Sequence, residues 1–164
     1  MRAHEIVEGP HDPYTYKAIF FAGSPGAGKT YVARKLAGVF GGLKQVNMDI
    51  IFKHLMTKNN LSWKMPPEEE PEREKQRQRS KELVTRQQQT YADGGLGLLI
   101  DSTGRSYDKI ENTKDQLESQ GYKTTMIFVN TDLQTALRRN KQRERTLPDE
   151  LIRKNFSAVE QQLG

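Results

Sequence analysis

The sequence predicts one α/β domain built round a parallel sheet of four or five strands, with helices on both sides. Short apolar runs alternate with segments of helical periodicity along all 164 residues. That order is typical of parallel sheets joined by right-handed crossovers. The apolar runs are continuous, as expected for strands buried on both faces. The length suits a single domain whose core is large enough to fold alone.

Four strands are expected from these runs. The clearest is residues 17–23, with the sequence KAIFFAG, which ends in glycine. The others are expected at residues 43–48, 96–101 and 124–130, and a fifth strand at the edge of the sheet stays open.

Six helices are expected between and after the strands. They are predicted over residues 29–40, 49–58, 72–92, 107–120, 133–143 and 148–162. In the first, Val32, Leu36, Val39 and Phe40 share an apolar face before the Gly41-Gly42 stop. The third is expected to be a solvated helix, because eleven of the fifteen residues from Glu68 to Glu82 are charged.

Composition excludes several classes of function. The chain has no cysteine, which excludes disulfides, thiolate metal sites and a cysteine nucleophile. No apolar run approaches the roughly 20 residues of a membrane span, so we expect a cytoplasmic protein without membrane contact. The net charge of +5 suits a polyanion or a small phosphate ester equally well.

A phosphate-binding loop is the most specific motif. It follows the first strand, opens a helix and satisfies G-x4-G-K-[ST] with Gly23, Ser24, Pro25, Gly26, Ala27, Gly28, Lys29 and Thr30. The glycines let successive N–H groups wrap an anion, and the helix start adds its positive dipole end. Lys29 is expected at the outer phosphates and Thr30 at a Mg²⁺ ion. The motif predicts a three-layer P-loop NTPase domain that binds a nucleoside triphosphate.

Two aspartates are expected at strand ends, where ligands of open α/β sheets bind. Asp49 follows the second strand and can accept a proton from a substrate hydroxyl. Asp101 ends the third strand and can help to hold Mg²⁺. The alternative for both is a capping role at a helix start.

Three arginines complete the candidate site. Arg139 and Arg143 are four residues apart, so one helical face can close both over triphosphate oxygens. Arg105 follows Asp101 at the same edge of the sheet. For the Arg139–Arg143 segment, an ordinary solvated basic helix is the alternative.

These motifs resemble the P-loop kinases that include zeta-toxin kinases and bacteriophage-type polynucleotide 5′-kinases. Asn47-Met48-Asp49 looks like the segment that carries their general base. The DSTGR sequence of residues 101–105 is closest to the zeta-toxin pattern, while residues 139–152 resemble the arginine-bearing lid of the polynucleotide kinases. The polynucleotide kinases carry an arginine shortly after the base aspartate, where this chain has Lys53.

The resemblance implies an ATP- and Mg²⁺-dependent kinase with Asp49 as base and Lys29, Arg105 and Arg143 as charge stabilisers. The implied acceptor is a nucleotide or a nucleic-acid 5′-end, as in a polynucleotide 5′-hydroxyl kinase or a zeta-toxin-like nucleotide-sugar kinase. The protein could be of phage origin and act in the host cytoplasm, and any protein partner is unidentified. The implied organisation is an extension (1–16) and a kinase domain (17–164) with a substrate-side insertion (59–92) and a lid (138–148).

Two other functions compete with a kinase. One is a nucleotide-binding assembly module in which the loop does no phosphotransfer. The other is a GTPase, which is disfavoured because no Asn-Lys-x-Asp guanine-binding motif follows a strand.

Overall fold

Four parallel strands form the centre of the structure, a computed structural model that describes residues 14–35, 41–102, 106–142 and 147–163. The strands are β1 (Lys17–Ala22), β2 (Lys44–Val46), β3 (Leu98–Asp101) and β4 (Lys123–Phe128). Their order is β2-β3-β1-β4, and all three pairings are parallel. The predicted α/β class is therefore confirmed, with four strands in the described residues.

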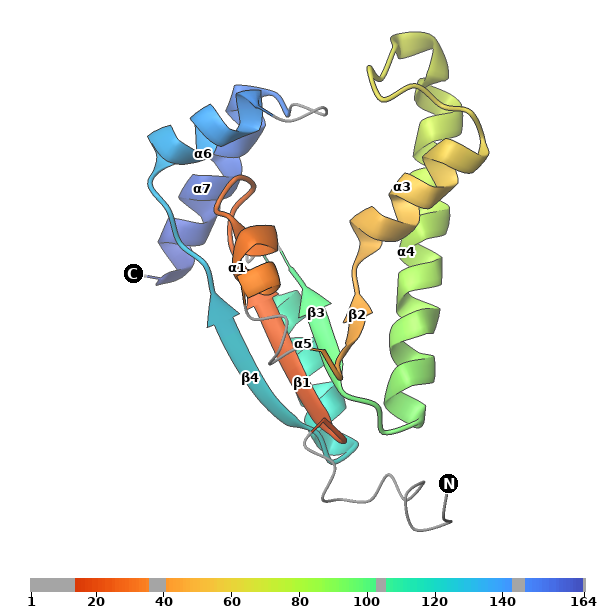
Figure 1. The fold of residues 1–164 in the computed structure, drawn as a ribbon, viewed down its shortest axis with the longest axis vertical. Coiled ribbons are helices and arrows are strands. Elements are labelled where there is room, and N and C mark those ends of the chain that lie inside the picture. The colour runs from red at the N-terminus through yellow and green to blue at the C-terminus, as the bar shows by residue number, and fades with distance from the viewer. Residues whose placement is uncertain (1–13, 36–40, 103–105, 143–146, 164) are drawn as a thin grey trace.

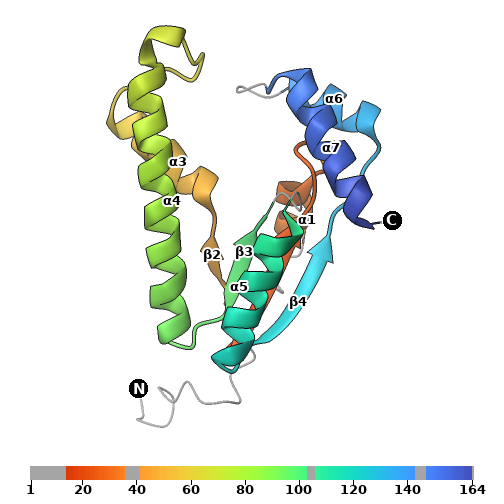
Figure 2. The same ribbon diagram turned by 180° about the vertical axis from the view of Figure 1, so that it is seen from behind.

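Helices cover both faces of this sheet, which gives three layers (Figures 1 and 2). α1 (Lys29–Lys35) lies on one face, and α5 (Tyr107–Ser119) lies on the other. α6 (Leu133–Lys141) and α7 (Asp149–Leu163) pack on each other beyond the carboxyl ends of the strands. The predicted helix over 29–40 is described as far as residue 35, and its residues 36–40 lie outside the described part.

Two apolar clusters, one on each face, hold the layers together. Successive residues of a strand point to opposite faces, so β1 supplies Ala18 and Phe20 to one cluster and Ile19 and Phe21 to the other. The first cluster packs against the helices of the α5 face through Val84, Tyr91, Ala92, Ile110 and Leu117. The second packs against α1 through Val32 and Ala33. None of the described helices is both long and apolar enough to cross a membrane.

α3 (Met48–Lys58), the short 3₁₀ helix η2 (Pro67–Glu69) and α4 (Glu70–Asp93) form an arm at the β2 edge of the sheet (Figure 1). We call residues 48–93 the α3–α4 arm. α3 buries Phe52, Leu55 and Met56. α3 packs against α4.

α4 corrects the expectation of a fully solvated helix. Its charged sequence nevertheless buries Arg73, Gln76 and Ser80, which lie three or four residues apart and so share one helical face. Arg73 forms an ion pair with Glu70 and donates to the carbonyl oxygen of Pro66 at 3.1 Å. Arg73 is buried because its hydrogen-bonding needs are met by its own helix and the loop before it.

Tyr122, the residue before β4, contacts two other segments of the chain. Its ring packs edge-on against Tyr16, with centroids 5.3 Å apart. Its hydroxyl donates to the carbonyl oxygen of Leu96 at 2.8 Å. Burial raises the pKa of Tyr122 to about 12.

Replacement of this tyrosine should destabilise the fold. We expect Tyr122→Phe to lower the free energy of unfolding by about 1–2 kcal/mol, because the Leu96 carbonyl loses its donor inside the protein. Urea unfolding at neutral pH measures this loss. Tyr107→Phe, at an exposed tyrosine, is the matched control and should leave stability unchanged.

The free energies of unfolding of wild type and Tyr122→Phe should become more similar at alkaline pH. A tyrosine whose pKa is raised by folding contributes stability that is complete below pH 10 and is lost as pH rises towards 12. The stability difference between wild type and Tyr122→Phe should therefore shrink over this range. A difference that stays constant across it would contradict the link between burial and titration.

Candidate functional site

The phosphate-binding loop connects β1 to α1, as the motif predicts. Gly26 and Gly28 have φ values of +88° and +102°, which side-chain-bearing residues rarely adopt. A Cβ atom on Gly26 would also lie 2.7 Å from the carbonyl oxygen of Ala136 in α6. The glycines are thus required both by the turn of the loop and by the close approach of α6.

Two cations hold carbonyl groups of this loop. Lys29 Nζ donates to the Gly23 carbonyl oxygen at 2.7 Å. Arg139 of α6 donates from Nη1 to the Ala27 and Gly26 carbonyl oxygens, at 3.1 Å and 3.3 Å. Arg139 therefore reaches the predicted nucleotide site, and its contact there is with the loop backbone. Arg143, its predicted companion, lies outside the described residues, as does Arg105.

Asp101 is placed at the end of β3, as predicted, and faces the loop. Its Oδ2 atom accepts a hydrogen bond from Asn47 Nδ2 at 2.6 Å. Its Oδ1 atom is buried and has no hydrogen-bond partner among the described residues. Burial raises the pKa of Asp101, and Asp49 adds to this rise. Lys29, the bond from Asn47 and the backbone N–H group of Ser102 lower the pKa.

Asp49 is not at a strand end, which corrects the sequence prediction. β2 ends at Val46, and Asp49 is in the first turn of α3. Asn47 is the N-cap of this helix, and it occupies the capping role that was the alternative for Asp49. Because the aspartate needs no capping contact, its exposed carboxylate can face the cleft.

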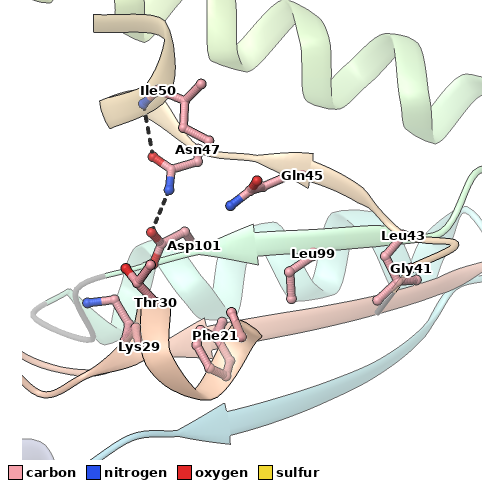
Figure 3. Close-up of a pocket in the computed structure, with 11 residues that line it drawn as sticks. Phe21, Lys29, Thr30, Gly41, Leu43, Gln45, Asn47, Ile50, Leu99 and Asp101 are labelled. Carbon is pink, nitrogen blue, oxygen red and sulfur yellow. Dashed lines mark hydrogen bonds between the residues drawn. The ribbon is translucent and has the colours of Figure 1, made fainter. Parts of the chain in front are cut away.

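Part of the phosphate-binding loop, Asn47 and both aspartates line one cleft of about 370 Å³. Its walls comprise Pro25, Gly26, Gly28, Lys29, Thr30, Asn47, Asp49, Asp101, Leu147 and Asn155. A second hollow, of about 480 Å³, shares Lys29, Thr30, Asn47 and Asp101 and continues over apolar residues of the sheet (Figure 3). The structure therefore gathers the predicted loop and both predicted aspartates in one place.

Thr30 and Asp101 fit a magnesium ion held largely by phosphate oxygens. The unpartnered Asp101 oxygen and the exposed Thr30 line the same cleft. Among the described residues, no group of three or more His, Cys, Asp or Glu side chains could hold a metal without a ligand's help. Mg²⁺ commonly binds through one or two protein oxygens together with substrate phosphates and water, so this donor set is suitable.

Three residues at or next to the cleft are not among the predicted site residues. Asn140 of α6 donates to the Leu147 carbonyl oxygen at 2.8 Å and accepts from the Leu147 N–H at 3.0 Å. This pair of bonds places Leu147 at the cleft. Asn155, a buried residue of α7, lines the cleft next to it. A polar residue on the inner face of an otherwise amphipathic helix was the available signal for Asn140 and Asn155.

Comparisons with solved structures agree with this fold. A chain from the Pnkp1/Rnl/Hen1 RNA repair complex matches with a TM-score of 0.67 and 14% identity, over 93% of this chain and 47% of that one. A chain from the PezAT chromosomal toxin–antitoxin system of Streptococcus pneumoniae matches with a TM-score of 0.60 and 21% identity, over 84% and 58%. A chain from the AvrRxo1-ORF1:-ORF2 structure with ATP gives 0.70 and 16%, over 90% and 48%. The chain thus spans about half the length of these three, and identities this low show a shared fold.

The sequence itself matches one family. A search of curated proteins found no match. The profile of the family described as "Zeta toxin", in contrast, matches residues 4–159. Because that match covers nearly the whole sequence, the chain belongs to the zeta toxin family.

Proposed function

We propose that the chain is an ATP- and Mg²⁺-dependent kinase that transfers the γ-phosphate to a hydroxyl of a nucleotide-type or nucleic-acid substrate. One observation carries the proposal: the phosphate loop, an aspartate with an unpartnered buried oxygen and an exposed aspartate line a single cleft. A site that only binds a nucleotide needs the loop alone. Phosphoryl transfer also uses one carboxylate that helps to hold Mg²⁺ and another that accepts the proton of the acceptor, and we assign the two aspartates to these roles.

The loop and Lys29 hold the triphosphate. Loop N–H groups contact its oxygens, and Lys29 exchanges its bond to the Gly23 carbonyl for the outer phosphates. Thr30 and Asp101 would hold Mg²⁺, which supplies charge neutralisation on the β- and γ-phosphate oxygens. Arg105 and Arg143 are proposed to stabilise charge on the transferred group.

Asp49 is the proposed general base. Its carboxylate accepts the proton of the acceptor hydroxyl while that oxygen forms a bond to the γ-phosphorus. The bond from the γ-phosphorus to the bridging oxygen breaks, and ADP leaves with the electron pair. An exposed carboxylate at the start of α3 suits this role because the acceptor can reach it from solvent.

Two acceptor classes are candidates, as the resemblance to zeta-toxin and polynucleotide kinases implies. One is a nucleic-acid 5′-hydroxyl, and the other is a nucleotide sugar. Lys53, the first basic residue after Asp49, has its Nζ 5.9 Å from the ring centre of Trp63. A point charge there lacks the bidentate fork with which arginine grips a phosphate. If the acceptor is a polynucleotide, its affinity for the protein should fall steeply as the salt concentration rises.

Transfer of labelled phosphate from ATP tests the function directly. The acceptor panel contains RNA, DNA, nucleosides and nucleotide sugars, and wild-type protein is expected to label one class. Lys29→Ala should abolish this labelling because the cation at the outer phosphates is removed. Tight ATP binding with no transfer to any member would instead identify a nucleotide-binding assembly module.

Asp49→Asn tests the general base. We expect the rate constant for transfer to fall about 10²- to 10⁴-fold, with little change in ATP affinity, because the amide cannot accept the proton. Single-turnover transfer and equilibrium ATP binding are the two measurements. An unchanged transfer rate in this variant would show that the base has been misassigned.

Arg139→Gln tests how α6 supports the loop. The variant should raise the KM for ATP on the order of tenfold, because the Gly26 and Ala27 carbonyls lose their charged donor. Arg138→Gln is the matched control, since Arg138 is an exposed neighbour on α6. Equal KM values for the two variants would argue against a specific role for the Arg139 contact.

A further inference from the structure

The side chain of Asn47 bonds both to the start of α3, which carries Asp49, and to Asp101 at the end of β3. It lies between β2 and α3 in extended conformation, with φ −145° and ψ 114°. Its Oδ1 atom accepts hydrogen bonds from the backbone N–H groups of Asp49, at 2.8 Å, and Ile50, at 3.3 Å. The amide oxygen thus fixes the first turn of α3, which carries the proposed base.

The other end of the same amide reaches a different strand. Asn47 Nδ2 donates to Asp101 Oδ2 at 2.6 Å across a sequence separation of 54 residues (Figure 3). The sheet register makes this contact possible, because Val46 of β2 lies opposite Ile100 of β3. The residues that follow, Asn47 and Asp101, therefore meet at the edge of the sheet.

This bond also decides which Asp101 oxygen is available. With Oδ2 engaged, the partly buried carboxylate cannot rotate freely, and Oδ1 is left without a partner among the described residues. The backbone bonds at the other end of the amide hold Asp49 in its turn. The planar side-chain amide of Asn47 therefore fixes where the two carboxylates lie relative to each other.

Resting on the proposed kinase function, we propose that Asn47 is a positioning residue that couples Asp49 to Asp101. Asparagine is suited to this because one amide carries both an acceptor and a donor. Aspartate would cap α3 but would set a carboxylate against Asp101. Serine would cap α3, yet its shorter side chain lacks the amide donor.

A purely structural cap makes a different prediction. Asparagine, aspartate and serine are similarly effective N-caps, so Asn47→Asp and Asn47→Ser would then behave like wild type in every assay. If the bridge to Asp101 matters, both variants should keep the cap of α3. Asn47→Ser should also keep a urea midpoint close to that of wild type and, at saturating Mg²⁺, the ATP affinity of wild type, whereas Asn47→Asp brings two carboxylates together and should lower the midpoint. The kcat of both variants should nevertheless fall on the order of 10- to 100-fold, the usual effect of losing a partner that orients a site group.

The experiment compares these two variants with Asn47→Ala and with Asn59→Ser in the full chain. Asn47→Ala removes cap and bridge together, so it should lower both the urea midpoint and kcat. Asn59 is the matched control, because it caps the opposite end of α3 and its side chain donates to the Leu55 carbonyl oxygen. Asn59→Ser should leave kcat and KM unchanged. Wild-type kcat in Asn47→Ser or Asn47→Asp would overturn the coupling.

A second readout separates this proposal from the proposed function. The Mg²⁺ concentration that half-maximally tightens ATP binding should rise 10- to 100-fold in Asn47→Ser, because Asp101 loses its orienting bond. If wild type transfers phosphate to no acceptor, the kinase proposal fails while this shift still supports the positioning of Asp101. If the Mg²⁺ dependence is identical in the two proteins, the positioning role is overturned whether or not transfer occurs.

Discussion

The parallel register of β3 with its two neighbours is the constraint on which the rest of the structure depends. Phe21 of β1 lies opposite Asp101, and Val46 of β2 lies opposite Ile100. The phosphate loop, Asp101 and Asn47 therefore leave three adjacent strands at the same level. A slip of one residue would turn Asp101 to the other face of the sheet and would break its bond to Asn47. Such a slip would also exchange the residues that each strand supplies to the two apolar clusters, and the packing of those clusters against different helices opposes it.

Contacts with the carbonyl groups of the phosphate-binding loop also orient its N–H groups, because peptide units are planar. Arg139 holds the Gly26 and Ala27 carbonyl groups from outside the loop. Because each peptide unit is planar, a fixed carbonyl also fixes the N–H group of the following residue. The N–H direction of Gly28 is thus set from α6, a helix far away in the sequence. Preorganised donors of this kind need little reorganisation when an anion binds, which is why a contact with backbone can serve phosphate binding.

The sequence predicts the features that depend on local patterns. The apolar runs and glycine stops locate every described strand to within about two residues, and the G-x4-G-K-[ST] pattern locates the loop. The strand before Asp49 is predicted two residues too long, because the sequence pattern does not separate the end of β2 from the cap and first residue of α3. The buried face of α4 escaped detection because Arg73 and Gln76 are polar, and their burial depends on partners supplied by the fold. The bridge from Asn47 to Asp101 joins residues of different strands, so it depends on strand order, which no local pattern encodes.

The two walls of the cleft come from different parts of the fold, one suited to the phosphate acceptor and the other to the nucleotide in the proposed reaction. Asp49 belongs to the α3–α4 arm, whereas Leu147 and Asn155 come from the region of α6 and α7. In-line transfer requires the attacking and leaving oxygens on opposite sides of the phosphorus, so the acceptor would approach from the arm and ADP would leave on the α6–α7 side. The α3–α4 arm contributes little net charge, because residues 48–93 contain nine Lys or Arg against eight Asp or Glu. Long-range attraction of a polyanion is therefore weak on this side, and acceptor choice must rest on contacts made within the cleft.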